Sequence, residues 1–263
     1  MSRLHFISCI TIALCFLLFT ATGYARNGTD EDYTPQIGQR GRDVLWIPTP
    51  QRLVDIMLDL AQVTSSDHVI DLGSGDGRIV IAAAQRGATA LGIEYNPVLV
   101  EFSRRAAVEA GVADRATFKE ADIFESDFSE ASVITLYLLQ SLNLRLKPTI
   151  LDMEPGTRVV SNSFNMGNWE PDQRIGLAHF WIVPARVDGT WQLDDGQIHF
   201  IQEFQKITGT LTMGKEMELV GKLEGYKITF SAGGVEYTGT VSANTISGTR
   251  AGSEPWQAIR LEY

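Results

Sequence analysis

Between residues 44 and 184, short apolar runs alternate with segments whose apolar positions recur every three or four residues. This alternation predicts parallel strands joined by helices that cover both faces of one sheet. The expected strands are residues 68–72, 88–94, 116–120, 132–138 and 157–161, and residues 177–183 can close the sheet. Helices are expected to begin near Pro50, where Thr49 can cap, and at Arg78 and Pro97.

From Gly189 onward the pattern changes to short strands of alternating polarity separated by glycines, as in residues 198–201 and 227–230. This pattern is typical of an antiparallel β sandwich or small barrel. The predicted fold class is therefore α/β, a Rossmann-like doubly wound sheet followed by a small antiparallel β sandwich or barrel. We place these domains at residues 44–184 and 185–263, with the polar residues 26–43 as a linker.

Residues 1–25 resemble a signal peptide. Arg3 gives a positive start, residues 6–19 are apolar, and Gly23 and Ala25 place small residues where signal peptidase prefers them. An uncleaved membrane anchor is the alternative, because the segment approaches the roughly 20 apolar residues that a spanning helix needs. We therefore expect either export, to the periplasm or beyond, or membrane association through this segment.

Charge and cysteine content narrow the possible chemistry. The net charge of −10 makes nucleic acid a poor partner and suits a basic substrate such as a lysine-rich protein segment. Cys9 and Cys15 both lie in the predicted leader, so a cleaved chain has no thiol for a disulfide, a nucleophile or a metal ligand. His68, His179 and His199 do not have metal-ligand spacing, and we expect no metal site.

Residues 71–77 read Asp-Leu-Gly-Ser-Gly-Asp-Gly, where the first predicted strand meets a helix. Glycines let the backbone turn sharply and approach a ligand, although the turn alone is compatible with a purely structural role. A dinucleotide fingerprint needs a third glycine where Arg78 stands. An acid before the glycines disfavours a pyrophosphate and suits a cation, such as the sulfonium and ammonium groups of S-adenosylmethionine. The expected cofactor contacts here are Asp71, Gly73, Ser74 and Gly75.

Acidic residues also end the next two predicted strands. Glu94 can accept hydrogen bonds from both ribose hydroxyls, with Tyr95 either covering the ribose or lying on the surface. Asp122 can accept from the adenine amino group, with Ile123 packed on the ring. Carboxyl ends of parallel strands meet at one edge of the sheet, which is where α/β proteins bind ligands. Asp76 either joins this site or caps the following helix.

These motifs resemble the class I S-adenosylmethionine-dependent methyltransferases over roughly residues 44–183. Within that class, residues 48–50, 71–80, 92–94, 135–139 and 155–161 resemble the mitochondrial-type protein-lysine N-methyltransferases of the ATP synthase c subunit and the adenine nucleotide translocase. The resemblance implies S-adenosylmethionine as cofactor, with contacts at Asp71, Gly73, Glu94 and Asp122. It also implies that residues 48–50 and 135–139 frame the transfer site. The leader and the C-terminal β module depart from that pattern.

The acceptor side of the predicted site is framed by Tyr137 and Thr49. Tyr137 can orient an acceptor amine or simply pack at its strand end, and Thr49 with Trp46 can form a channel wall. Further residues that could face the acceptor are Asn162, Phe164 and Trp169.

We therefore expect a methyltransferase that N-methylates a protein lysine or another amine. The alternative is an exported, non-catalytic nucleoside- or small-ligand-binding protein that keeps this fold, because S-adenosylmethionine is made in the cytosol. The C-terminal module could itself be a small-ligand or envelope-binding barrel. No feature of the sequence predicts an oligomeric state.

Overall fold

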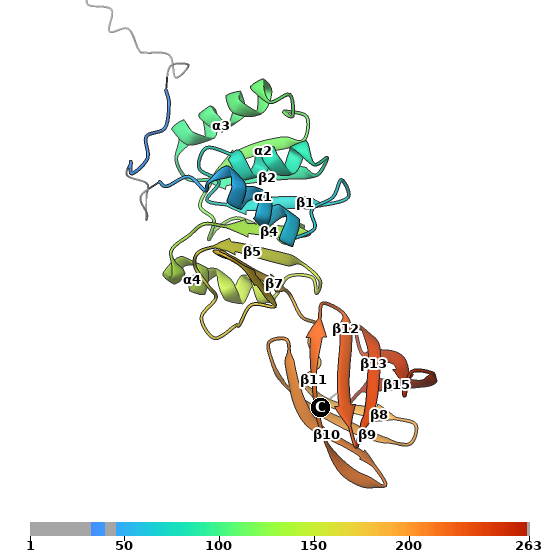
Figure 1. The fold of residues 1–263 in the computed structure, drawn as a ribbon. Helices are drawn as coiled ribbons and strands as arrows, with labels where there is room; N and C mark the ends of the chain where they lie inside the picture. Colours follow the sequence, from blue (N-terminus) through green and yellow to red (C-terminus); the bar gives the residue numbers. More distant parts are fainter. Residues whose placement is uncertain (1–32, 40–45, 262–263) are drawn as a thin grey trace, which may run out of the picture.

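The computed structural model describes residues 33–39 and 46–261, which form a helix-covered sheet followed by a barrel (Figure 1). The predicted leader and most of the predicted linker lie outside the described residues. None of the helices in the described part of the chain has the length and apolar character that crossing a bilayer requires.

The first unit contains a seven-stranded sheet in the order β3-β2-β1-β4-β5-β7-β6. The first five strands in chain order are parallel, and β7 and β6 add an antiparallel edge. The order reverses between β1 and β4, which leaves a crevice at the carboxyl ends of these two strands. The strands are β1 (His68–Leu72), β2 (Thr89–Glu94), β3 (Ala116–Glu120), β4 (Val133–Leu136), β5 (Arg158–Asn162), β6 (Gln173–Ile175) and β7 (Ala178–Ile182).

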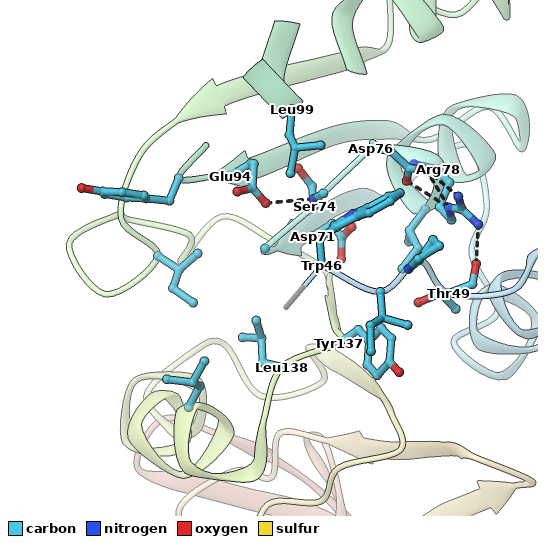
Figure 2. A pocket seen from close by; sticks show the side chains of 18 of the residues that line it. Trp46, Thr49, Asp71, Ser74, Asp76, Arg78, Glu94, Leu99, Tyr137 and Leu138 are labelled. Atoms are coloured by element: carbon cyan, nitrogen blue, oxygen red, sulfur yellow. Dashed lines mark hydrogen bonds and ion pairs between the residues drawn. The ribbon is translucent and has the colours of Figure 1, made fainter. Parts of the chain in front are cut away.

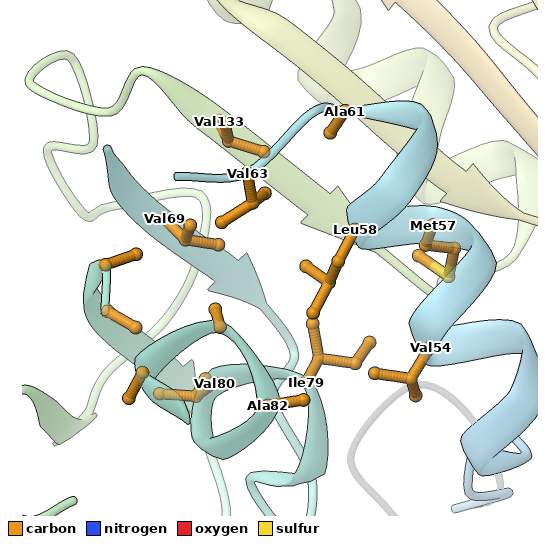
Figure 3. Packing of buried hydrophobic residues seen from close by; sticks show 14 of the residues in the cluster. Val54, Met57, Leu58, Ala61, Val63, Val69, Ile79, Val80, Ala82 and Val133 are labelled. Atoms are coloured by element: carbon orange, nitrogen blue, oxygen red, sulfur yellow. The ribbon is translucent and has the colours of Figure 1, made fainter. Parts of the chain in front are cut away.

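Four helices pack on this sheet and bury a core on each face. They are α1 (Gln51–Leu60), α2 (Arg78–Gln85), α3 (Pro97–Glu109) and α4 (Gln140–Leu151). On one face, Leu58 of α1 and Ile79 of α2 pack in the same cluster as Val69 of β1 (Figure 3). The next residue along β1, Ile70, belongs to the opposite cluster, which includes Ile150 of α4. This alternation explains why the central strands are continuously apolar.

The second unit is a closed barrel of eight antiparallel strands, which decides between the two predicted architectures. Aromatic rings fill its interior, and Phe230 stacks on Tyr237 with ring centroids 4.7 Å apart. The interior is therefore a packed core. Its strands are β8 (Gly189–Leu193), β9 (Gly196–Glu203), β10 (Lys206–Met213), β11 (Lys215–Glu224), β12 (Lys227–Ala232), β13 (Val235–Ser242), β14 (Thr245–Arg250) and β15 (Glu254–Arg260).

Several local expectations need correction. Helix α1 begins at Gln51 with Pro50 as its N-cap, and no side chain caps it. The Thr49 hydroxyl instead accepts a hydrogen bond from Asn162 Nδ2 at 3.3 Å, because β5 ends beside it. Strand β4 ends at Leu136, so Tyr137 lies beyond the strand. The sequence pattern missed α4 and the three-residue β6.

Candidate active site

One pocket of about 220 Å³ opens at the carboxyl ends of the parallel strands (Figure 2). Figure 2 shows Asp71, Ser74 and Glu94 on one side of it and Tyr137 and Leu138 on the other. Ten of the residues that the sequence placed in the site line it: Thr49, Asp71, Gly73, Ser74, Gly75, Glu94, Tyr95, Asp122, Ile123 and Tyr137. Trp46, Phe164 and Leu138 of the expected segment 135–139 also line it, and so do residues that sequence reasoning missed, namely Leu99, Phe124 and Leu142.

The glycine turn joins β1 to α2 and forms the floor of the pocket. Gly75 has a φ of +55°, which favours glycine. A Cβ atom added there would lie only 2.6 Å from Trp46 Nε1, so the indole packs directly on the backbone of the turn. The turn therefore requires glycine both for its conformation and for this close approach.

Asp71 is a buried carboxylate at the centre of the pocket, with only 2% of its surface exposed. The pKa of Asp71 is raised to about 7, chiefly by burial and to a smaller extent by the negative charges of Glu94 and Asp76, against a hydrogen bond donated by Thr135 Oγ1 at 2.7 Å. Ser74 Oγ nearby is buried and has no hydrogen-bond partner among the described residues. A cationic ligand with hydrogen-bonding groups would satisfy both side chains.

Glu94 is held by the backbone on two sides. Its Oε2 accepts a hydrogen bond from Gly75 N at 3.0 Å, and its Oε1 accepts from Asn96 N at 2.8 Å. Each carboxylate oxygen keeps a second lone pair, so the group is oriented and can still accept from a ligand hydroxyl. Asn96 is the N-cap of α3, and its side chain accepts a hydrogen bond from Val98 N at 3.0 Å.

Asp122 and its neighbours form the side of the pocket beyond β3. Asp122 Oδ1 accepts a hydrogen bond from Phe124 N at 2.9 Å, which shapes this turn. The Arg145 guanidinium lies 3.6 Å from the centre of the Phe124 ring and braces it from α4. Ile123 and Phe124 thereby give this wall an apolar surface suited to a flat ring, and the adenine contact stays a prediction.

Asp76 lines the pocket, and its Oδ1 also accepts a hydrogen bond from the backbone N–H of Arg78, the first residue of α2, at 3.4 Å, although the N-cap position itself is Gly77. Asp76 forms an ion pair with Arg78, with Oδ2 2.5 Å from Nη2. Arg78 Nη1 also donates to the carbonyl oxygen of Thr49 at 2.8 Å. The pair therefore ties the segment around Thr49, which is itself 3% exposed, to the glycine turn.

The opposite wall is aromatic. Tyr137 stacks against Phe164 with ring centroids 6.5 Å apart. Two other residues that the sequence placed toward the acceptor lie elsewhere. Asn162 is buried against Thr49, and Trp169 is fully buried beside Trp181.

The first unit is similar to known methyltransferases. The family described as the ANTKMT methyltransferase domain matches residues 71–173. A protein-lysine N-methyltransferase of Saccharolobus islandicus is 41% identical over 135 residues, which are 50% of this chain and 84% of that relative. The Mus musculus lysine N-methyltransferase named for the C subunit of ATP synthase is 39% identical over 127 residues, and the chain spans only 48% of its length.

This chain is also similar to a solved structure that contains a bound ligand. The crystal structure of an RNA methyltransferase from Salinibacter ruber in complex with S-adenosyl-L-homocysteine is 49% identical, with a TM-score of 0.53. The similarity covers 54% of this chain and 96% of that one.

The doubly wound sheet, the glycine turn and the acids at its strand ends define an S-adenosylmethionine-dependent methyltransferase. The chain belongs to the ANTKMT methyltransferase domain family, and S-adenosylmethionine is its cofactor. The site fits S-adenosylmethionine. The buried carboxylate of Asp71 and the Ser74 hydroxyl, which has no partner among the described residues, face a pocket whose charged lining is mostly acidic.

Proposed function

We propose that this enzyme transfers a methyl group to the side-chain amine of lysine in a protein substrate. The observation that carries the proposal is the joining of an acidic end, around Asp71 and Glu94, to an aromatic wall formed by Tyr137 and Phe164 in one pocket. The two relatives named for lysine methylation support this choice of acceptor.

Some residues of the pocket bind the cofactor, and others exclude water from the acceptor. When bound, S-adenosylmethionine supplies a methyl group activated by its sulfonium. Asp71 and Glu94 would hold the cationic and hydroxyl-bearing ends of the cofactor. An acceptor lysine must lose its proton before transfer, and burial among apolar and aromatic side chains disfavours the charged ammonium. Tyr137 and Phe164 supply that environment, and the Tyr137 hydroxyl can accept a hydrogen bond from the amine.

RNA is the competing acceptor, because the Salinibacter ruber relative is named for it. The net charge of −10 weighs against RNA, since affinity for a phosphate backbone depends on lysine and arginine. It favours a basic protein segment, which an acidic surface attracts.

We also propose that the enzyme is exported or held at the membrane by residues 1–25, which lie outside the described residues. The support is the sequence pattern alone: a positive start, an apolar stretch and small residues at positions 23 and 25. Cell fractionation, with the N-terminus of the mature chain determined by mass spectrometry, tests this location. A chain found in the cytosol with its first 25 residues intact would contradict it.

Radiolabelled methyl transfer tests the acceptor. The purified full chain is incubated with labelled S-adenosylmethionine and fractionated cell-envelope proteins, with and without ribonuclease, and the labelled side chain is then identified by mass spectrometry. We expect ribonuclease-resistant label on lysine, lost in Asp71→Ala and Glu94→Ala and kept in Glu109→Gln, an exposed acid at the end of α3. Label confined to RNA would refute the lysine assignment.

A further inference from the structure

The hairpin between β9 and β10 packs its tip against the apolar core of the first unit. Figure 1 shows the barrel beside the β5–β7 side of the sheet. From the tip, Phe204 packs against the apolar cluster beneath α4 and stacks on Trp169, with ring centroids 6.1 Å apart and planes at 20°. Gln205 Nε2 donates to the carbonyl oxygen of Glu170 at 2.8 Å, and Lys147 Nζ lies 5.4 Å from the Phe204 ring centre.

Trp169 lies in the segment that connects β5 to β6, residues 163–172, which we name the β5–β6 loop. The same loop carries Phe164 into the pocket beside Tyr137. At the pocket end, Asn143 Nδ2 donates to the Phe164 carbonyl at 3.2 Å. At the far end, Trp181 Nε1 donates to the Trp169 carbonyl at 2.8 Å, and the Phe204 ring covers the Trp169 side chain. One short loop therefore joins the barrel to the aromatic wall.

Phe204 does not occupy this position because of local preference. Its φ of +54° is the left-handed conformation, which is unfavourable for a bulky side chain and tolerated by asparagine. The hairpin therefore carries a conformational cost at its tip. Strain of this kind persists only where surrounding structure holds it in place.

We propose that Phe204 and Gln205 are positioning residues, through which the barrel fixes the β5–β6 loop and thereby the acceptor wall at Phe164. This inference rests on the proposed function for its account of the acceptor. The sheet order places β6 and β7 at one edge and β2 and β3, which carry Glu94 and precede Asp122, at the other. The contact with the barrel therefore influences the position of the acceptor wall of the pocket and not the position of the residues that bind the cofactor. The family match ends at residue 173, before the barrel begins.

Two substitutions in the full chain separate the ring contact from the hairpin itself. Phe204→Asn removes the ring and introduces a residue that tolerates the left-handed conformation. Phe204→Tyr keeps an aromatic ring at the same position. Ile201→Ala, at a 57% exposed position on β9, is the matched control. Hydrogen exchange is followed in the β5–β6 loop and in residues 71–77. S-adenosyl-L-homocysteine affinity is measured by calorimetry, and methyl transfer by its KM and kcat for poly-L-lysine.

In Phe204→Asn we expect faster hydrogen exchange in the β5–β6 loop alone. The S-adenosyl-L-homocysteine affinity should stay within about twofold, and KM for poly-L-lysine should rise about tenfold, since small misplacements at a site have effects of this order or larger. Phe204→Tyr and Ile201→Ala should behave as wild type. Unchanged loop exchange in Phe204→Asn overturns the inference, and so does a parallel loss of cofactor affinity. If wild type methylates no poly-L-lysine, the kinetic result counts against the proposed function, and hydrogen exchange still decides this inference.

Discussion

The affinity for cofactor should depend on pH through Asp71. Burial raises the pKa of this carboxyl to about 7, with further contributions from Glu94 and Asp76. A positively charged ligand binds best to the ionised carboxylate, so binding below pH 7 must be coupled to release of its proton. Affinity should therefore rise as pH rises toward and through the pKa of Asp71 in the free enzyme.

The size of the effect follows from that pKa. If only ionised Asp71 binds, the apparent Kd scales with one plus the ratio of protonated to ionised carboxyl. With a pKa of about 7, the apparent Kd should fall about fifteenfold between pH 5.5 and 7.0. Asp71→Asn removes both the charge and the titration. It should weaken binding about ten- to a hundredfold at pH 7, as expected for a hydrogen bond to a charged group, and flatten the pH profile.

Isothermal titration calorimetry with S-adenosylmethionine, which carries the sulfonium charge, measures this directly, and titrations in buffers of different ionisation enthalpy report the proton released. Thr135→Val is the sharpest companion variant, because it removes the hydroxyl that donates to Asp71 Oδ1. That hydrogen bond lowers the pKa of Asp71, so without it the midpoint of the profile should move to higher pH. A wild-type Kd that is constant from pH 5.5 to 7.0, or a Thr135→Val midpoint at lower pH, would refute the reasoning.

Three further predictions concern stability and the glycine turn. Because the native state holds the Asp71 proton more tightly than the unfolded chain, Asp71 should destabilise the free enzyme as pH rises from about 4 to 7. Asp71→Asn should therefore raise the melting temperature at pH 8 and change it little at pH 4; equal shifts at both would contradict this. Gly75→Ala should weaken S-adenosyl-L-homocysteine binding about tenfold or more, as measured by calorimetry, because Gly75 has a positive φ and the new Cβ would lie 2.6 Å from Trp46 Nε1. A variant with wild-type affinity would contradict this prediction. Phe230→Ala in the packed barrel should cost about 3–5 kcal/mol in chemical denaturation, and a loss below about 1 kcal/mol would show that the interior is loosely packed.

The sequence by itself determined the parallel strands of the sheet and the acidic residues of the pocket. Periodicity is a local property, so the bounds of β1 and β3 and the start of α2 followed from the sequence alone. Parallel strands present their carboxyl ends at one edge, so acids that end β1 and β2 and follow β3 had to meet there. The three acids, Asp71, Glu94 and Asp122, do line one pocket.

Only the tertiary structure decided how that pocket is held together. Thr49 could cap a helix by local rules, yet β5 brings Asn162 to its hydroxyl and Arg78 reaches its carbonyl. The alternating strands after Gly189 are equally compatible with a sandwich, and pairing of β15 with β8 closes them into a barrel. Trp169 is buried among Trp181 and Phe204, which comes from a hairpin tip of that barrel. Such contacts join residues far apart in the chain, and their free energy depends on long-range packing that no local pattern records.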